Sequence, residues 1–208
     1  TASSRRISEK AAAEKLLAGC REEMVSTIQK ITRKEKAENP PPLYDLTTLQ
    51  RDANRLLGYS AQQTLDYVQS LYEKQLTTYP RTDSCYIADE DEEMLEELAE
   101  ELEDFLGFVS EDADDDVPRT RRTVNRQKVT DHHAIIPTVQ IERIRLDELP
   151  GGERSILQLI ICKLLCAVNE PYAYETVTAV FECGDAKFTT KGRTVISEGW
   201  KDIDCLFR

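Results

Sequence analysis

The residues best suited to chemistry form one short run, QLTTYPRTDS, at residues 75–84. Five hydroxyl groups lie there beside one arginine and one aspartate. Pro80 lacks a backbone N–H and biases Tyr79 away from helical dihedral angles, so we expect the tyrosine where a helix has just ended. Side chains at i and i+2 of an extended segment share a face, so Tyr79, Arg81 and Asp83 should project together.

A tyrosine in this setting could act as a nucleophile. A free phenol has a pKa of about 10, so roughly one in a thousand is ionised at neutral pH, and a nearby cation or proton acceptor is needed. The guanidinium of Arg81 is available for a phosphate, and the carboxylate of Asp83 is available to hold that guanidinium. The ordinary alternative is a surface loop in which the tyrosine is half-buried and the arginine is paired to the aspartate.

A second motif, DHHAIIPT, lies at residues 131–138. The segment TTYPRTDS followed by this motif resembles the type IA DNA topoisomerases, and the form HHAIIPT is similar to their topoisomerase III branch. The resemblance covers nearly the full chain. It implies that Tyr79 attacks a backbone phosphorus of single-stranded DNA, forms a 5′-phosphotyrosyl link and releases a 3′-hydroxyl. Because the link stores the bond energy, resealing would need no ATP.

The same resemblance implies roles for further residues. Arg81 would neutralise the attacked phosphate, and His132 matches the position of the family's active-site histidine. Asp83 and Ser84 would orient the arginine and contact the strand. The expected catalytic residues are Tyr79, Arg81 and His132, and the expected nucleic-acid-binding residues are Thr82, Asp83, Ser84, His133 and Arg122.

A metal is expected for the reaction but not among these residues. Paired histidines can suggest a metal site, but the chain contains only two histidines, and we favour a phosphate contact for His132. In the resembled family Mg²⁺ is held by acidic residues of an N-terminal metal-binding domain, which also supplies a catalytic lysine. We find no such domain in this sequence. We therefore expect a central fragment that completes its active site with that domain and by itself does not relax DNA.

The net charge of −12 is concentrated in one segment. Residues 89–116 contain sixteen Asp and Glu and no Lys or Arg, so the remaining chain has 27 basic against 23 acidic side chains. That remainder can still present cations to phosphates. A basic cluster precedes the histidine motif: Arg119, Arg121, Arg122, Arg126 and Lys128.

The cysteines and the hydropathy favour a cytoplasmic protein, and the resemblance implies that it is nucleoid-associated. No two cysteines form a CxxC pair, so we predict buried, reduced thiols rather than a zinc site or disulfides. They are Cys20, Cys85, Cys162, Cys166, Cys183 and Cys205. No apolar stretch reaches the roughly 18 residues of a membrane span, and the N-terminus lacks an apolar signal region, so we expect no membrane association.

Periodicity and capping signals predict a helical centre between strand-forming ends. The first helix is expected at 7–22. A second should begin at an N-cap, Asp45, and end at Gly58, and a third should begin at a capping box formed by Ser60 and Gln63. A fourth should run from a cap formed by Asp89 and Glu92 to Leu106, and a fifth should follow a break at 151–152. Strands are expected at 24–33, 139–145, 174–183, 187–190 and 194–197, with a turn at 184–185. Residues 34–42 should be a connector, and 111–116 an acidic loop.

These elements predict an α+β fold. The strand near Val25 should pair in one sheet with the strands after Tyr174. By resemblance, an arch domain (1–74 and 147–208) is interrupted by a mainly helical catalytic-tyrosine domain (75–146), similar to a winged helix or helix-turn-helix. The two short helices before Tyr79 would be its platform.

Two other functions fit parts of the pattern. The short helix pair also suits a non-catalytic helix-turn-helix nucleic-acid-binding module. The acidic helix suits an interaction domain whose partner is a protein. Steep salt dependence of binding would support either nucleic-acid function, whereas only a topoisomerase predicts a covalent adduct at Tyr79.

Overall fold

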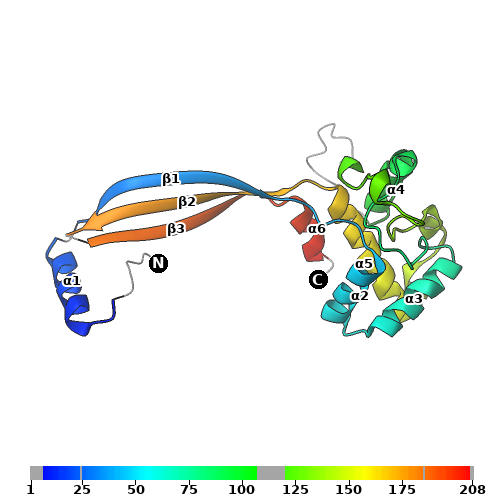
Figure 1. Ribbon diagram of the computed structural model, residues 1–208, viewed down its shortest axis with the longest axis horizontal. Coiled ribbons are helices and arrows are strands. Elements are labelled where there is room, and N and C mark those ends of the chain that lie inside the picture. Colours follow the sequence, from blue (N-terminus) through cyan, green and yellow to red (C-terminus); the bar gives the residue numbers. More distant parts are fainter. Residues whose placement is uncertain (1–6, 24, 107–119, 185, 207–208) are drawn as a thin grey trace. The chain divides into compact units, whose positions relative to one another are not determined.

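The computed structural model describes residues 7–23, 25–106, 120–184 and 186–206. The chain divides into two compact units (Figure 1). The sheet unit comprises Thr1–Glu38 and Tyr172–Glu198, and the helical unit comprises Asn39–Pro171 and Gly199–Arg208. The expected domains were an arch of residues 1–74 and 147–208 and a catalytic-tyrosine domain of residues 75–146. The compact units have other boundaries, because the helices before and after residues 75–84, here called the tyrosine loop, pack into one core with it.

The sheet unit contains three antiparallel strands in the order β1-β2-β3. Strand β1 (Thr27–Glu38) pairs with β2 (Tyr172–Cys183), which pairs with β3 (Ala186–Ser197). The predicted pairing of the N-terminal strand with those after Tyr174 is therefore confirmed. Helix α1 (Lys10–Glu23) belongs to the same unit and has no buried residue.

Two strands are longer than predicted. Residues 34–38 continue β1 instead of forming a connector, and β3 runs unbroken through Gly192. In both places the backbone pairs with β2: Lys36 is opposite Tyr174, and Gly192 is opposite Val177. Ladder hydrogen bonds outweigh the weak strand preference of charged residues and glycine.

The helical unit contains α2 (Leu46–Leu57), α3 (Ala61–Glu73), α4 (Glu92–Leu106), α5 (Gly151–Val168) and α6 (Trp200–Leu206). The caps predicted at Asp45 and Ser60 are present, each in a capping box. Gly58 ends α2 in the left-handed conformation, with φ 73°. The predicted Asp89 cap is wrong, because residues 89–91 form a 3-10 turn that leads directly into α4.

The predicted strand at 139–145 is also wrong. Val139–Arg143 is a 3-10 helix that begins where the Thr138 side chain accepts a hydrogen bond from the Gln140 backbone. Ile141 is its buried residue. The alternating pattern suited a strand, but the cap at Thr138 favours a helical turn instead. Further 3-10 turns are Thr120–Arg122, Arg126–Lys128 and Leu146–Glu148.

Helix α5 forms the centre of the hydrophobic core. It contacts α2, α3, α4 and α6, and twelve of its residues are buried. Fully burying one Leu or Ile side chain contributes about 1.5–3 kcal/mol, so this helix dominates the packing of its unit. The predicted break at residues 151–152 is instead the first turn of α5. No helix in the described ranges is long and apolar enough to cross a membrane.

The cysteines are only partly as predicted. All six are free, but only Cys162 and Cys166 are buried. Cys20, Cys85 and Cys183 are half-buried, and Cys205 is exposed on the short helix α6. The thiols of Cys162 and Cys166 lie 4.0 Å apart, one helical turn along α5. The predicted acidic loop at 111–116 lies outside the described residues.

Candidate active site

The tyrosine loop begins where α3 ends. Gln75 adopts a positive φ of 61°, and the backbone N–H of Leu76 donates to the carbonyl of Leu71. Leu76 is 2 % exposed and anchors the start of the loop in the core. The chain therefore leaves the helix at a defined point before Tyr79.

The loop is paired with the histidine motif. Backbone N–H groups of Thr78 and Thr138 donate to the carbonyls of Ile136 and Leu76, at 3.0 and 3.1 Å. The Thr78 hydroxyl donates to the Ala134 carbonyl at 2.9 Å and accepts from the Ile136 N–H at 3.0 Å. Two segments far apart in sequence thus form one small backbone scaffold.

Tyr79 and His132 meet across this scaffold. Their ring centroids are 4.4 Å apart, with the planes tilted by 46°. On α3, Tyr72 makes an edge contact with the Tyr79 ring, with centroids 5.4 Å apart. Tyr79 is half-buried, and its hydroxyl has no hydrogen-bond partner among the residues that the structure describes. The ring is therefore held in place while the oxygen stays available.

Arg81 and Asp83 are exposed but do not form the pair expected for an ordinary loop. Within the described ranges Arg81 makes no hydrogen bond or ion pair. The Asp83 carboxylate instead accepts from the Thr130 hydroxyl at 3.3 Å. The guanidinium remains available for an external anion, and orientation of Arg81 by Asp83 is not seen.

Thr82 and Ser84 are buried and use their hydroxyls inside the protein. Thr82 donates to the backbone carbonyl of His132, and Ser84 to that of Lys128, both at 2.9 Å. The Thr82 carbonyl accepts from the N–H of Leu46, the first residue of α2. The structure therefore places both side chains as supports of the loop and of the histidine.

His133 and Arg122 point to other neighbours. His133 is half-buried, with Nδ1 2.8 Å from the carbonyl oxygen of Ala134. Arg122 is exposed and donates to the carbonyl of Asn169, just after α5. Two other members of the basic cluster are also paired: Arg121 with Glu92, the first residue of α4, and Arg126 with Glu90 in the 3-10 turn before it.

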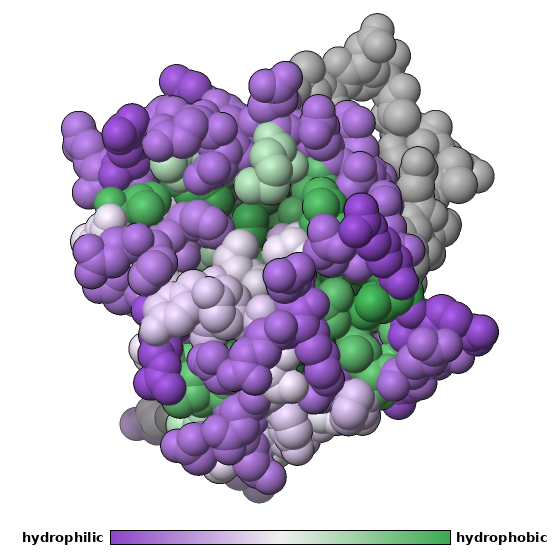
Figure 2. All heavy atoms as spheres, turned by 90° about the vertical axis from the view of Figure 1, so that its right-hand side faces the viewer, coloured by the Kyte–Doolittle hydropathy of each residue, from purple (hydrophilic) through white to green (hydrophobic). Residues whose placement is uncertain are grey.

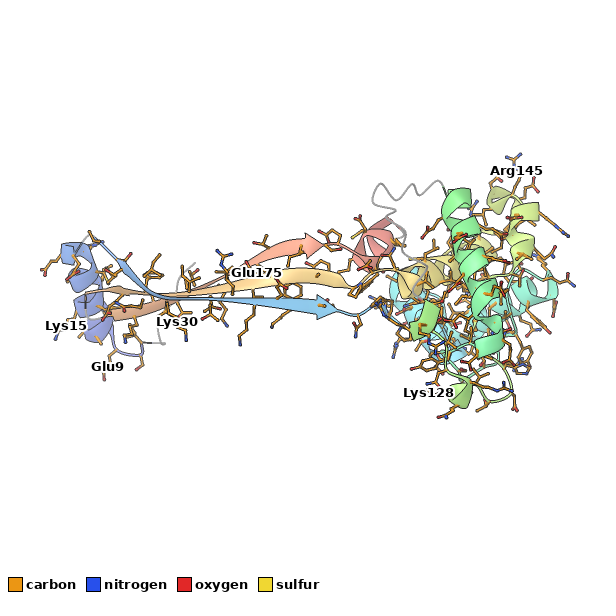
Figure 3. The ribbon with its side chains drawn as sticks, turned by 90° about the horizontal axis from the view of Figure 1, so that it is seen from above. Glu9, Lys15, Lys30, Lys128, Arg145 and Glu175 are labelled. Atoms are coloured by element: carbon orange, nitrogen blue, oxygen red, sulfur yellow. The ribbon has the colours of Figure 1, made fainter. Side chains whose placement is uncertain are left out.

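Lys128 and Arg119 complete the basic cluster. Lys128 is exposed (Figure 3), and its Nζ donates to the Tyr86 hydroxyl at 3.2 Å. Arg119 lies outside the described residues. Hydrophilic side chains cover most of the face of the molecule in Figure 2, and apolar ones gather in the gaps between them.

A buried polar network supports the histidine motif from behind. The Tyr44 carbonyl accepts from the Ile135 N–H at 2.8 Å, and the Tyr44 hydroxyl donates to Asp52 at 2.9 Å. Lys163 on α5 donates to the same carboxylate oxygen at 3.2 Å and lies over the Tyr44 ring. The sequence held no motif for this network, because its members come from three separate segments.

Charge interactions hold this network in a fixed protonation state. Burial, and then the neighbouring Asp52, raise the pKa of Tyr44 far above its ordinary value. Burial alone would raise the pKa of Asp52, but Lys163 and the hydrogen bonds from Tyr44, Lys163 and Arg55 outweigh it, and this pKa is lowered. Tyr44 therefore stays a neutral phenol beside an ionised carboxylate.

The described residues do not fit a metal centre. Within those ranges no group of three or more His, Cys, Asp or Glu side chains is placed to hold an ion. A Mg²⁺ ion takes convergent oxygen ligands, whereas the acidic residues of α4 form a row along one helix. We assign no metal ligand and derive no step through a metal.

Comparison with known proteins identifies the family of this chain. A family profile described as DNA topoisomerase matches residues 1–205. The chain therefore belongs to the DNA topoisomerase family, as its two motifs predicted. Its similar sequence relatives include proteins named DNA topoisomerase 3.

Two relatives illustrate the match. DNA topoisomerase 3 of Bacillus subtilis is 39 % identical over 183 residues, which is 86 % of this chain and 24 % of that protein. The Bacillus licheniformis protein of the same name is 38 % identical over 190 residues, which is 90 % of this chain and 26 % of that protein. The chain thus spans about a quarter of their length.

A solved structure shares the fold. Full-length topoisomerase I from Thermotoga maritima matches with a TM-score of 0.62 and 22 % identity, over 95 % of this chain and 33 % of that chain. At this identity the likeness shows the fold, which is a mixed one of helices with a three-stranded antiparallel sheet.

Proposed function

We propose that this chain carries the nucleophile of a type IA DNA topoisomerase and that Tyr79 cleaves and reseals single-stranded DNA. The observation that carries the proposal is the free hydroxyl of Tyr79, whose ring is fixed between Tyr72 and His132. Arg81, two residues along, adds a cation with no partner among the described residues. A phenol held in position, near in sequence to a guanidinium that has no partner among the described residues, suits attack on a phosphodiester.

The proposed step balances as a transesterification. The Tyr79 oxygen forms a bond to phosphorus, and the bond from phosphorus to the 3′ oxygen breaks. The 3′ oxygen leaves and takes up a proton, while the 5′ phosphate stays on the tyrosine. Resealing is the reverse attack by the 3′-hydroxyl, so no ATP is consumed. Arg81 neutralises charge on the phosphate, and His132 contacts the phosphate from the other motif.

The remaining site residues divide into two groups. Asp83 is exposed beside Arg81 in sequence, and we propose that it contacts the strand together with His133 and Arg122. Thr82 and Ser84 act mainly by holding the loop, because their hydroxyls already have backbone partners. The Mg²⁺ that the family's reaction uses would supply further charge neutralisation, with ligands from outside the described residues.

We also propose how the units relate to the family's architecture. The sheet unit corresponds to part of the arch, and α2 with α3 is the helix-turn-helix-like platform that positions Tyr79. The metal-binding domain is proposed to be elsewhere in the same polypeptide, in a cytoplasmic, nucleoid-associated enzyme. The 208-residue chain alone would then bind single strands weakly without relaxing supercoiled DNA.

The decisive experiment replaces the matching quarter of Bacillus subtilis DNA topoisomerase 3 by this chain. We expect the chimaera to form a denaturant-resistant adduct with a single-stranded oligonucleotide, and Tyr79→Phe to abolish it while strand binding changes less than twofold. The phenylalanine keeps the ring contacts and loses only the nucleophilic oxygen. Denaturing gels measure the adduct, and peptide mapping locates it.

Two further variants serve as controls. Tyr67→Phe removes a phenol from the same helical unit outside the site and should leave the adduct unchanged. His132→Ala should slow cleavage by about 100- to 1,000-fold without abolishing it, in the range of one lost hydrogen-bond donor to the reacting oxyanion. An adduct that persists in Tyr79→Phe, or a chimaera that binds strands but never forms an adduct, would refute the assignment.

A further inference from the structure

One face of the sheet unit has a chemical character that the proposed function does not use. It contains an open hollow of about 560 Å³ lined by residues of all three strands. The lining side chains are four cations and three threonines: Thr32, Lys34, Lys36, Thr176, Thr178, Lys191 and Arg193, with Gly192 between the last two. We call this surface the lysine–threonine face. Among the residues that the structure describes, no carboxylate lines this hollow.

The strand register explains why the cations gather on one side. Lys34, Thr176 and Arg193 form one cross-strand row, and Thr32, Thr178 and Lys191 form the next. Side chains alternate between faces, so the residues between these belong to the opposite side. There Arg33 pairs with Glu175 at 2.9 Å. Alternation thus puts Glu175 on the side away from the lysines, whereas Glu38 shares their face and pairs with Arg193.

The lysines of this face have no hydrogen-bond or ion-pair partner among the described residues. Lys34, Lys36 and Lys191 are exposed, and their ammonium groups have no hydrogen bond or ion pair within the part of the chain that the structure describes. Three unneutralised charges on one small sheet face repel each other. An anionic ligand would relieve that repulsion.

Aromatic rings adjoin the cations. Tyr174 is opposite Lys36 and two residues from Thr176, so it belongs to the same face. The Arg193 guanidinium lies 3.7 Å from the centroid of the Tyr174 ring and 4.9 Å from that of Tyr172. The two tyrosine rings are 5.5 Å apart. The arginine also pairs with Glu38, so it acts chiefly as part of this stack.

The arrangement favours one kind of anion. Cations at every second residue of a strand are about 6.8 Å apart, a spacing that suits successive phosphates of an extended chain. A basic groove beside aromatic platforms is the general design for single-stranded nucleic acid, because phosphates meet cations while bases stack on rings. We propose that the lysine–threonine face binds a single nucleic-acid strand, with phosphates on its lysines and threonines and a base on Tyr174.

This site is independent of the proposed cleavage function, because every residue in it belongs to the sheet unit. The test measures binding of a dye-labelled oligothymidylate to the 208-residue chain by fluorescence anisotropy across a salt series. The variant is Lys34→Gln/Lys36→Gln/Lys191→Gln. Its matched control is Lys10→Gln/Lys15→Gln/Arg21→Gln, which removes the same charge from exposed positions of α1 in the same unit.

The expected results are quantitative. Each phosphate contact contributes about 0.7 to the slope of log affinity against log salt for single strands, so the variant's slope should fall by about 2. Affinity at low salt should weaken at least tenfold, with the control within twofold of the parent chain. Tyr174→Leu should weaken binding by about 5- to 150-fold, the range for one stacked base.

Other outcomes overturn the proposal. Equal affinity and slope in the variant and its control would place binding elsewhere. Competition by oligoglutamate as strong as by the oligonucleotide, with no effect of Tyr174→Leu, would assign the face to an acidic polypeptide. The cleavage assignment is read from the covalent adduct of the chimaera and this site from the anisotropy of the 208-residue chain, so failure here and failure of the cleavage assignment are distinguishable.

Discussion

Two tyrosines of the helical unit show how surroundings set what one side chain can do. Tyr44 is 3 % exposed, and its hydroxyl is bound to Asp52, whose charge and burial keep the phenol protonated. Tyr79 is half-buried, with ring contacts on two sides and a hydroxyl that makes no hydrogen bond to the described residues. The Tyr44 hydroxyl is therefore used in a structural hydrogen bond, whereas the Tyr79 hydroxyl remains available for a reaction.

The Asp52 carboxylate gives a prediction about pH and stability. Asp52→Asn keeps the shape but leaves Lys163 without its ion-pair partner, so unfolding free energy at pH 7 should fall by about 2–3 kcal/mol. The folded-state pKa of Asp52 is lowered, so this stabilisation is present above the unfolded value near 4 and is lost as pH falls through the folded value.

Urea unfolding at pH 7, 5 and 3 would measure this effect. The difference between parent and variant should be constant from pH 7 to 5 and shrink at pH 3. Asp66→Asn, on the exposed side of α3, should cost less than about 0.5 kcal/mol throughout. A loss for Asp52→Asn that is equally large at pH 3 would show that the charge is not responsible.

At the scale of elements, α3 is fixed against α5 so that its end can direct the tyrosine loop. Glu153, 8 % exposed on α5, accepts from the Ser70 hydroxyl at 2.9 Å and pairs with Lys74 at the end of α3. Next to it Gly152 leaves room for the Tyr67 ring, because a Cβ there would lie 2.3 Å from the ring. The close approach of the two helices needs glycine at this position.

We predict that Gly152→Ala lowers the unfolding free energy by about 1–3 kcal/mol through overpacking against Tyr67. Gly151→Ala is the matched control, because nothing lies within 4 Å of its added Cβ, and it should be neutral or slightly stabilising. A double-mutant cycle isolates the contact: in a Tyr67→Ala background the cost of Gly152→Ala should vanish. Equal costs in both backgrounds would contradict the packing argument.

At the scale of the whole molecule, the two compact units have unequal cores. The helical unit has a large buried cluster centred on α5, whereas β1 has no buried residue and α1 has none among its described residues. Burial of apolar area supplies most of the free energy of folding, so the sheet unit should open more readily. A nucleic-acid-binding face on it would therefore be the less stable part of the protein.

Hydrogen exchange followed by mass spectrometry tests this difference. We expect amides of α5 to exchange at least 100-fold more slowly than those of β1, and amides of α1 to exchange fastest. Binding of an oligonucleotide to the lysine–threonine face should slow exchange in β1 and β3 while leaving α5 unchanged. Opening of α5 and β1 with the same free energy would show that the units unfold as one.

The sequence by itself determined the family, the nucleophile candidate and most helix boundaries. Family membership follows from two linear motifs, and the caps at Asp45 and Ser60 depend on residues only three positions apart. The pairing of the first strand with those after Tyr174 also followed, because few other segments had strand-forming composition. Signals of this kind act over short distances along the chain, so they can be recognised without knowing the fold.

The tertiary structure decided which polar groups remain available. Thr82 and Ser84 turn inward because backbone carbonyls from the histidine segment need donors, and Asp83 binds Thr130 rather than Arg81. A linear motif specifies a residue but not its partner. Buried polar groups must be paired, and their partners here lie about fifty residues away, so only the folded chain settles which side chain is left for a ligand.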